Sequence, residues 1–233
     1  MDEMAVRACR EWFLHCVDAG PPSVLHKYTL AALAMHLGVD VLYCDMDAVP
    51  VGPDPLGALL REAGDADLAV STHTYNCMNA GVWYARASGV TGHFFLTLLE
   101  YLYKHWYEID QRAFEALASG NVSVSHLDEY RRRLGPGLAP RVAVLSPDVF
   151  AGSAGFARKE SVVLFHAYAV YGAEKLALVR ALLGFGVMPQ EARSSRGLIG
   201  SWWGDDRSRA SARDAALEAI ARFEKPRKEA PCW

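Results

Sequence analysis

The sequence predicts an α/β fold with a central, mostly parallel sheet and helices on both faces. Helical and strand patterns alternate along the 233 residues, as they do in layered α/β proteins. The apolar run over 41–44 is typical of a parallel strand covered on both faces. Asp45 and Asp47 follow that run directly, at the end of a strand where open α/β sheets bind their ligands.

The first half of the chain supplies helices that alternate with strands. The expected elements are a helix over 4–17, a helix over 23–37, a strand over 41–44, a short helix after the turn-rich 51–55 and a strand over 67–72. Gly20-Pro21-Pro22 ends the first helix. Ser23 is the expected cap of the second helix, and Gly38 is its C-terminal stop.

The second half continues the alternation. The expected elements are a strand over 81–86 after the turn-like 79–81, a helix over 91–106, strands over 142–145 and 162–165, and helices over 173–183 and near 211–223. The apolar face of the helix over 91–106, which ends at Trp106, suits the core better than a sugar-binding platform. We expect one α/β domain over 1–188 and a Ser- and Arg-rich extension over 189–233 with a short helix.

Composition excludes several classes of protein. A net charge of -3 and a pI near 6.2 argue against a nucleic-acid or anionic-membrane partner. Arg131-Arg132-Arg133 follows two acidic residues and is expected to form a solvated helix face. No stretch reaches the roughly 18 continuous apolar residues of a membrane helix, and the first residues are acidic rather than basic as in a secretory signal. No membrane segment is therefore expected.

The five cysteines do not predict a metal site. No two of them form a CxxC pair, so a structural zinc site is not expected. Cys44 lies on the predicted core strand, where it is expected to be a small buried hydrophobic residue.

Polar residues with useful chemistry stand at several predicted strand or helix ends. Asp45 and Asp47 bring two carboxylates together, and a hard divalent cation such as Mg²⁺ or Mn²⁺ relieves their repulsion. The other candidates are Asn79, Gly81, Asp110, Gln111 and His166. Each also has a purely structural interpretation: a solvated Asp turn, an Asn-x-Gly turn, a helix N-cap at Asp110 or a hydrogen-bonded histidine.

The order of these segments resembles a known family. The segments that carry the resemblance are Lys27 through LGVDVLYCDMDAV, DPLGAL at 54–59, ADLAVST at 66–72, MNAGVWYARAS at 78–88, DQRAF at 110–114 and VVLFHAYAVYGAEK at 162–175. Together they are similar to the nucleotide-diphospho-sugar transferases of the Rossmann-like GT-A fold. The closest group is glycosyltransferase family 77, with its rhamnogalacturonan xylosyltransferases and extensin-type arabinosyltransferases. The resemblance covers about residues 25–183.

The resemblance implies a metal centre and a reaction. Asp47 would coordinate Mn²⁺ or Mg²⁺, Asp45 would bind the ribose or share the metal, and His166 would supply a further ligand. The implied activity is metal-dependent transfer of a sugar from a UDP-pentose or UDP-hexose donor to a glycan or glycoprotein acceptor, with retention expected.

The resemblance also implies the residues that contact the donor. Lys27 is a substrate-binding residue in this scheme. Lys175 would pair with the diphosphate and Gly172 would let the backbone approach it. Asn79 and Gly81 would line the sugar pocket. Asp110 and Gln111 are the catalytic candidates that face the donor sugar, and no covalent intermediate is assigned to them.

Two further expectations come from the family. Its members open with a strand that carries part of the uridine pocket, and this sequence is expected to begin just after that strand, which places activity in question. The compartment implied by the family is the Golgi lumen, although no signal or anchor stands in the sequence.

Two other functions fit part of the sequence. Haloacid-dehalogenase-type phosphatases also carry an apolar strand that ends in DxDx(T/V), with Asp45 as nucleophile and Asp47 as acid/base. Their last motif needs an apolar strand before paired acids, and Asp205-Asp206 has none before it. The other alternative is an inactive relative that only binds a sugar nucleotide.

Overall fold

The computed structural model describes residues 23–45, 47–52, 54–74, 77–119, 126–152 and 161–167. The expected helices over 4–17 and 173–183, the extension over 189–233, and the candidates Gly172 and Lys175 lie outside the described residues. The division into a domain over 1–188 and an extension therefore stays a prediction.

The described residues form an α/β structure with five helices and seven strands. The helices are α2 (Leu25–His36), α3 (Pro55–Ala63), α4 (Gly89–Lys104), α5 (Asp110–Ser119) and α6 (Leu127–Leu138). The strands are β1 (Val41–Cys44), β2 (Ala48–Pro50), β3 (Leu68–Thr74), β4 (Cys77–Ala85), β5 (Val142–Val144), β6 (Phe150–Gly152) and β7 (Leu164–His166). The α/β class predicted from the sequence is confirmed.

The strands form two mixed sheets. The larger has the order β1-β4-β3-β5 and the smaller β2-β7-β6. Strand β4 is antiparallel to both of its neighbours, β7 is antiparallel to β2, and only the β3–β5 and β6–β7 pairs are parallel. The expectation of a mostly parallel sheet is not confirmed for the described residues. Only residues 75–76 separate β3 from β4, and so short a connection allows only an antiparallel hairpin.

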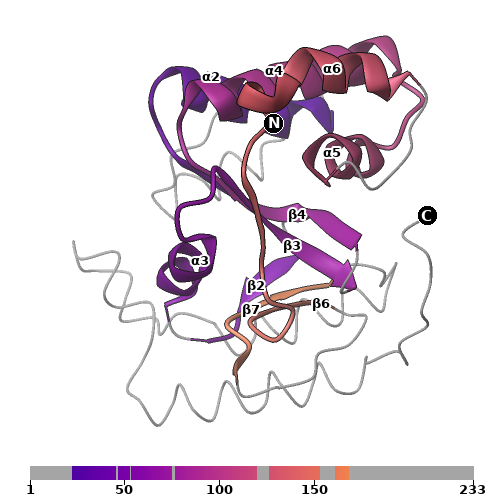
Figure 1. Cartoon of the computed structure of the whole chain (residues 1–233). Helices are drawn as coiled ribbons and strands as arrows, with labels where there is room; N and C mark the ends of the chain where they lie inside the picture. The colour runs from indigo at the N-terminus through magenta and orange to yellow at the C-terminus, as the bar shows by residue number, and fades with distance from the viewer. Residues whose placement is uncertain are drawn as a thin grey trace, which may run out of the picture.

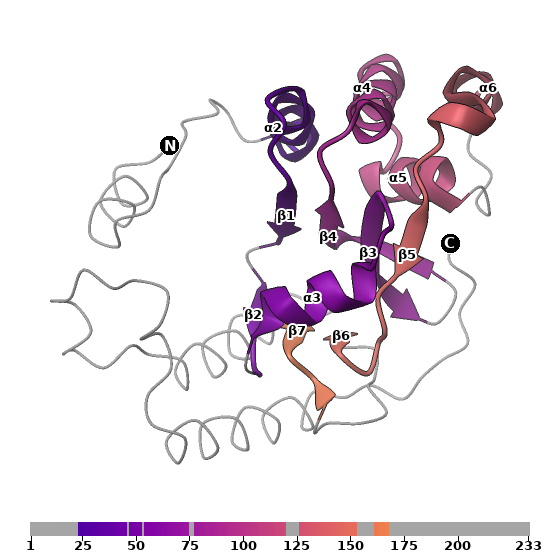
Figure 2. The same ribbon diagram turned by 60° about the vertical axis from the view of Figure 1, so that its left-hand side comes forward.

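Helices cover both faces of the larger sheet. Figure 1 shows α2, α4, α5 and α6 gathered on one side of it, with α3 apart from them. Alternate residues of β3 divide between two apolar clusters, because successive side chains of a strand point to opposite faces. Leu68 and Val70 pack with the four helices, whereas Ala69 packs with α3 and the smaller sheet. Figure 2 shows the strands of the larger sheet side by side beneath α2, α4 and α6.

Helices α2 and α4 lie close to their predicted positions, with two differences. The N-cap position is Val24 rather than Ser23, but Ser23 Oγ accepts the backbone N–H of Leu25, the first residue of α2, at 3.2 Å, so the expected contribution of Ser23 is borne out in part. Helix α4 begins at a capping box formed by Ser88 and Thr91. It ends at Lys104, so Trp106 falls beyond the helix and is 84% exposed. The expectation that Trp106 faces the core is therefore wrong.

Strand β1 differs most from its expected environment. It pairs with β4 on one side only among the described residues, and its side chains are alternately half-buried and exposed. The prediction of a strand covered on both faces is wrong, and so is the prediction that Cys44 is buried. An apolar run does not distinguish a central strand from an edge strand, because strand position depends on pairing.

The remaining differences are smaller. The predicted turn over 79–81 lies inside β4, where the β3–β4 pairing shifts register between Val70 and Ser71. Arg131–Arg133 lie on α6, and Arg133 forms ion pairs with Glu100 and Glu129, as expected for a solvated helix face. Within the part of the chain that is described, none of the helices combines the length and the apolar character that crossing a bilayer requires.

Candidate metal centre

The end of β1 and the middle of β4 fix the backbone at Asp45. Asp45 follows the last residue of β1, and its backbone N–H donates to the carbonyl oxygen of Gly81 on β4 at 2.7 Å. The register shift in β4 brings Gly81 to this point, since three residues of β4 have no partner on β3 there. Bulges of this kind often redirect side chains next to functional sites. The irregular part of β4 therefore positions the first acidic residue.

The smaller sheet brings Asp47 and His166 together. Ala48 on β2 pairs with His166 on β7, and the backbone N–H of Ala167 donates to the carbonyl oxygen of Asp47 at 3.0 Å. Residues separated by more than a hundred positions in sequence are thus neighbours in one antiparallel ladder. Because the chain passes from β1 to β2 within three residues, the two acidic residues connect the two sheets.

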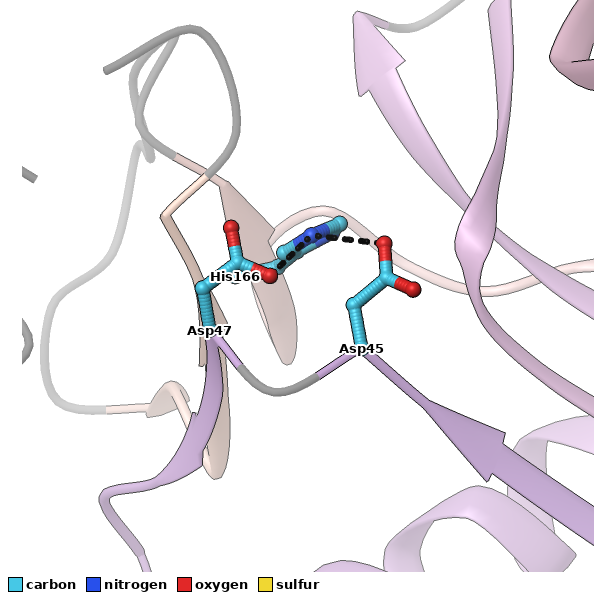
Figure 3. A group of neighbouring side chains, drawn as sticks. All are labelled: Asp45, Asp47 and His166. Carbon is cyan, nitrogen blue, oxygen red and sulfur yellow. Dashed lines mark ion pairs between the residues drawn. The ribbon is translucent and has the colours of Figure 1, made fainter. Parts of the chain in front are cut away.

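The three side chains converge. His166 Nε2 lies 3.3 Å from Asp47 Oδ1 and 3.6 Å from Asp45 Oδ2. One ligand atom from each residue lies within 4.8 Å of the other two. Figure 3 shows the imidazole between the two carboxylates, with an ion-pair contact to each. The side chain of His166 is 6% exposed, that of Asp47 14% and that of Asp45 36%, so the group opens to solvent at Asp45.

Gly81 makes this convergence possible. A Cβ at position 81 would lie 2.8 Å from Asn79 Oδ1 and closer still to Asp45 Oδ2 and His166 Cε1. These separations are too short for any side chain. Asn79 is buried, and its Oδ1 accepts the backbone N–H of Gly81 at 2.7 Å. The structure therefore brings Asn79 and Gly81 next to the acidic pair and the histidine.

Tyr43, which is not among the candidates predicted from the sequence, orients Asp45. Its hydroxyl donates to Asp45 Oδ1 at 2.6 Å, which leaves Oδ2 on the side of His166. Burial, with help from the bond to Asp45, raises the pKa of Tyr43, so the phenol remains a donor at ordinary pH. Its ring stacks on Trp83 with centroids 5.2 Å apart. The two-residue spacing on one strand was a usable signal, because residues i and i+2 share a face.

Lys27 and Asp110 form an ion pair beside Tyr43. Lys27 Nζ lies 2.7 Å from Asp110 Oδ2, and both side chains are largely buried. The Tyr28 hydroxyl donates to the same oxygen at 2.9 Å, and burial raises the pKa of Tyr28 well above its ordinary value. Lys27 Nζ also lies 5.4 Å from the centroid of the Tyr43 ring. This pair is therefore next to the acidic cluster, with Tyr43 between them.

Gln111 and Glu115 brace the irregular part of β4 from α5. Gln111 Nε2 donates to the Met78 carbonyl at 2.7 Å, and Gln111 Oε1 accepts the Ala80 N–H at 3.3 Å. The carboxylate of Glu115, which is 1% exposed, accepts the N–H of Met78 at 3.1 Å. In this structure Gln111 therefore holds the backbone on either side of Asn79. Its expected role toward a donor sugar stays a prediction.

The donor set fits a divalent cation. Two carboxylates and one imidazole with their ligand atoms facing one another form an electron-rich group that a cation stabilises, and carboxylates suit Mg²⁺ and Mn²⁺ while imidazole suits later transition metals. Three protein ligands leave positions for a substrate, and the exposed side of the group lies at Asp45. The predicted grouping of Asp45, Asp47 and His166 is therefore observed as geometry, whereas occupancy by a metal is an inference from it.

In comparisons with known proteins, no family model, curated protein or solved structure matches the chain.

Proposed function

We propose that this chain is a metal-dependent glycosyltransferase of GT-A-like architecture that uses a nucleoside-diphosphate sugar, such as a UDP-pentose or UDP-hexose. The observation that carries the proposal is the convergence of Asp45, Asp47 and His166 from two sheets on one point. A solvated Asp turn would not require a nearly buried imidazole at 3.3 Å or a glycine that leaves space for it.

A divalent ion at this point, when bound, would neutralise the charge that develops on a departing nucleoside diphosphate. The ligands would be Asp47, Asp45 and His166. The mixed oxygen and nitrogen donors favour Mn²⁺ over Mg²⁺, because Mg²⁺ in proteins is held mainly by carboxylates, waters and phosphates. Tyr43 would hold Asp45 in the orientation that directs Oδ2 to the ion.

The residues around the centre would hold the donor sugar. Asp110 contacts both Lys27 and Tyr28 through Oδ2, so its other carboxylate oxygen, Oδ1, would be the one that faces the sugar. Asn79 and Gly81 would line the sugar pocket beside it. We infer a front-face, retaining transfer, in which a nearby carboxylate stabilises an oxocarbenium-like centre without forming a bond to it.

The Golgi lumen is the compartment that fits this function. Cys77, at the start of β4, is disulfide-bonded, and disulfides persist in oxidising compartments such as the secretory pathway. This observation supports the compartment without depending on the metal centre.

Binding of UDP with and without Mn²⁺, measured by calorimetry, tests the proposal. The parent should bind UDP more tightly with Mn²⁺, and Asp47→Ala should lose at least about tenfold in that Mn²⁺-dependent affinity, or about 1.4 kcal/mol. The fold should remain intact, because removing one carboxylate relieves repulsion in the cluster. Asp128→Ala, which removes an exposed carboxylate on α6, is the matched control. Equal Mn²⁺-dependent binding of UDP by Asp47→Ala and the parent would reject the metal assignment.

A turnover assay separates the remaining alternatives. Metal-dependent turnover of one member of a UDP-sugar panel supports the transferase. Release of phosphate from p-nitrophenyl phosphate would instead indicate the phosphatase. Metal-dependent UDP binding without hydrolysis or transfer, even with an upstream strand added, would indicate a sugar-nucleotide binder.

A further inference from the structure

Aromatic side chains lie on the surface between α4 and α5. Trp106 is 84% exposed and Tyr107 62% exposed, and Ile109 follows them at 50%. We call Trp106 and Tyr107 the aromatic pair. Large exposed aromatic residues side by side usually mark a binding surface, whereas single exposed apolar residues are common. The pair is not used by the metal centre or by the residues that brace it.

The aromatic pair is held in place by ring contacts. The His105 ring stacks on Tyr101 with centroids 4.5 Å apart and on His126 with centroids 5.5 Å apart. Tyr107 meets the edge of the His105 ring, and its hydroxyl lies 3.2 Å from His105 Nδ1. Trp106 and Tyr107 have centroids 6.2 Å apart and nearly perpendicular rings. A surface that is already ordered loses less conformational entropy when a ligand binds.

The chemistry of the pair suits a neutral carbohydrate. One face of a sugar ring presents C–H groups that pack on an aromatic face, while the hydroxyls at its edge can bond to an indole N–H or a phenol. Charged side chains near the aromatic pair are themselves paired. Before it in the sequence, Lys104 forms an ion pair with Glu100 at 2.7 Å, and after it Arg112 forms one with Glu108 at 3.6 Å. The flanking charges are therefore balanced, and they give no preference for a charged ligand.

Another exposed apolar group among the described residues has a different character. Leu30, Leu33 and Leu37 on or beside α2 are exposed and aliphatic. Aliphatic side chains pack well against other protein but offer no flat ring face and no polar edge to a sugar. The contrast favours a glycan at the aromatic pair over the aliphatic group on α2.

The aromatic pair is also close to the proposed donor site. Trp106 stands four positions before Asp110 in the sequence, so their Cα atoms lie at most about 14 Å apart. Asp110 pairs with Lys27, whose Nζ lies 5.4 Å from the Tyr43 ring, and Tyr43 bonds to Asp45. An acceptor role for the aromatic pair therefore requires an oligosaccharide long enough to reach from Trp106 to Asp110.

We propose that Trp106 and Tyr107 form a subsite for a neutral glycan acceptor, on which sugar rings stack while the end of the glycan reaches the donor sugar near Asp110. The role as an acceptor subsite rests on the proposed glycosyltransferase function. The binding of a neutral glycan does not, because it follows from the exposure, order and charge balance of the pair.

Titration of the full chain with cellohexaose and xylohexaose, followed by ligand-observed NMR, tests the subsite. The parent should bind at least one of the two, Trp106→Ala should weaken that binding by at least about fivefold, and Trp106→Phe should retain most of it, because an aromatic face remains. Leu96→Ala, which removes an exposed apolar side chain on α4, is the matched control and should bind as the parent does. Mn²⁺-dependent UDP binding should be the same in all four proteins.

Three results would overturn the proposal: no binding of either hexasaccharide by the parent, equal binding by Trp106→Ala, or preferential binding of trigalacturonic acid. Loss of phosphatidylcholine vesicle binding in Trp106→Ala, without a change in hexasaccharide binding, would assign the pair to a membrane surface instead. If Asp47→Ala keeps its Mn²⁺-dependent UDP binding while Trp106→Ala loses the glycan, the proposed function fails and the glycan site stands.

Discussion

At the scale of single residues, the site depends on a glycine, Gly81, as much as on the acidic residues and the histidine. Gly81 lies where a Cβ would collide with side chains from three directions: Asn79, Asp45 and His166. Its backbone carbonyl meanwhile accepts the N–H of Asp45. Gly81 therefore both anchors the acidic residue and leaves the space in which the imidazole approaches it.

Gly81→Ala should therefore damage the metal centre more than the fold. The added methyl group would displace His166 or Asp45, so Mn²⁺ affinity measured by calorimetry should fall at least about tenfold. Overpacking of this kind also costs about 1–3 kcal/mol of stability, measured by denaturant unfolding. Gly89→Ala is the control, since a Cβ there has open space. An unchanged Mn²⁺ affinity in Gly81→Ala would show that the three side chains do not need to meet.

At the scale of elements, hydrogen bonds to Asp40 join the start of β1 to the end of β4. Its carboxylate accepts the backbone N–H of Ala87 at 2.7 Å and the hydroxyl of Tyr84 at 2.5 Å. The Ala87 bond, followed by the Tyr84 bond, holds the pKa of Asp40 below its usual range. These contacts hold the first residues of β1 against the last residues of β4. They therefore help to set the β1–β4 register, which brings Asp45 to Gly81 at the other end of β1.

The lowered pKa of Asp40 predicts a pH dependence of stability. Because its pKa is lower in the folded protein than in the unfolded chain, the stabilisation is present above the unfolded pKa of about 3.9 and is lost as the pH falls through the folded value. Free energies of unfolding measured in urea should therefore decrease less for Asp40→Asn than for the parent as the pH is lowered from 5 into the acid range. Tyr84→Phe should show an intermediate decrease. At neutral pH Asp40→Asn should lose at most about 1 kcal/mol, since the group is exposed. If the stability of Asp40→Asn and that of the parent depended on pH in the same way, the proposed role of Asp40 in joining the two strands would be contradicted.

The elements with strong periodicity were predictable, and the pairings between them were not. The spacing of Phe94, Phe95 and Leu98 predicted α4, because helix burial leaves a 3.6-residue pattern in the sequence. Nothing local to Ala48 predicted a strand that pairs with β7, because β2 has three residues and its pairing is long-range. The strand directions and the exposed position of β1 were missed for the same reason.

The candidate site was predictable in part. Asp45, Asp47 and His166 were found because each is a polar residue at the end of an apolar segment, and the structure brings them together. Tyr43 and Glu115 were not singled out, since a tyrosine in an apolar strand and a glutamate in a helix resemble ordinary core and surface residues. The role of Glu115 is revealed only by its contact with β4, whereas the two-residue spacing from Asp45 is the one local signal for the role of Tyr43.

At the scale of the whole molecule, the site lies where the two sheets meet. The larger sheet supplies Gly81, the smaller supplies His166, and Asp45 and Asp47 lie in the short connection between the two sheets. Helix α5 braces β4 from the side, and the aromatic pair stands just before that helix. Under the proposed function, a donor at this junction and an acceptor on the aromatic pair would meet near Asp110.

Electron-nuclear double resonance of bound Mn²⁺, with ¹⁵N-labelled histidine and added UDP, tests most directly whether the imidazole and a diphosphate share one ion. We predict ¹⁵N and ³¹P couplings in the same spectrum, and loss of the ¹⁵N coupling in His166→Ala, which assigns it among the eight histidines. Bound Mn²⁺ with ³¹P coupling but no ¹⁵N coupling, or a ¹⁵N coupling that persists in His166→Ala, would contradict the account.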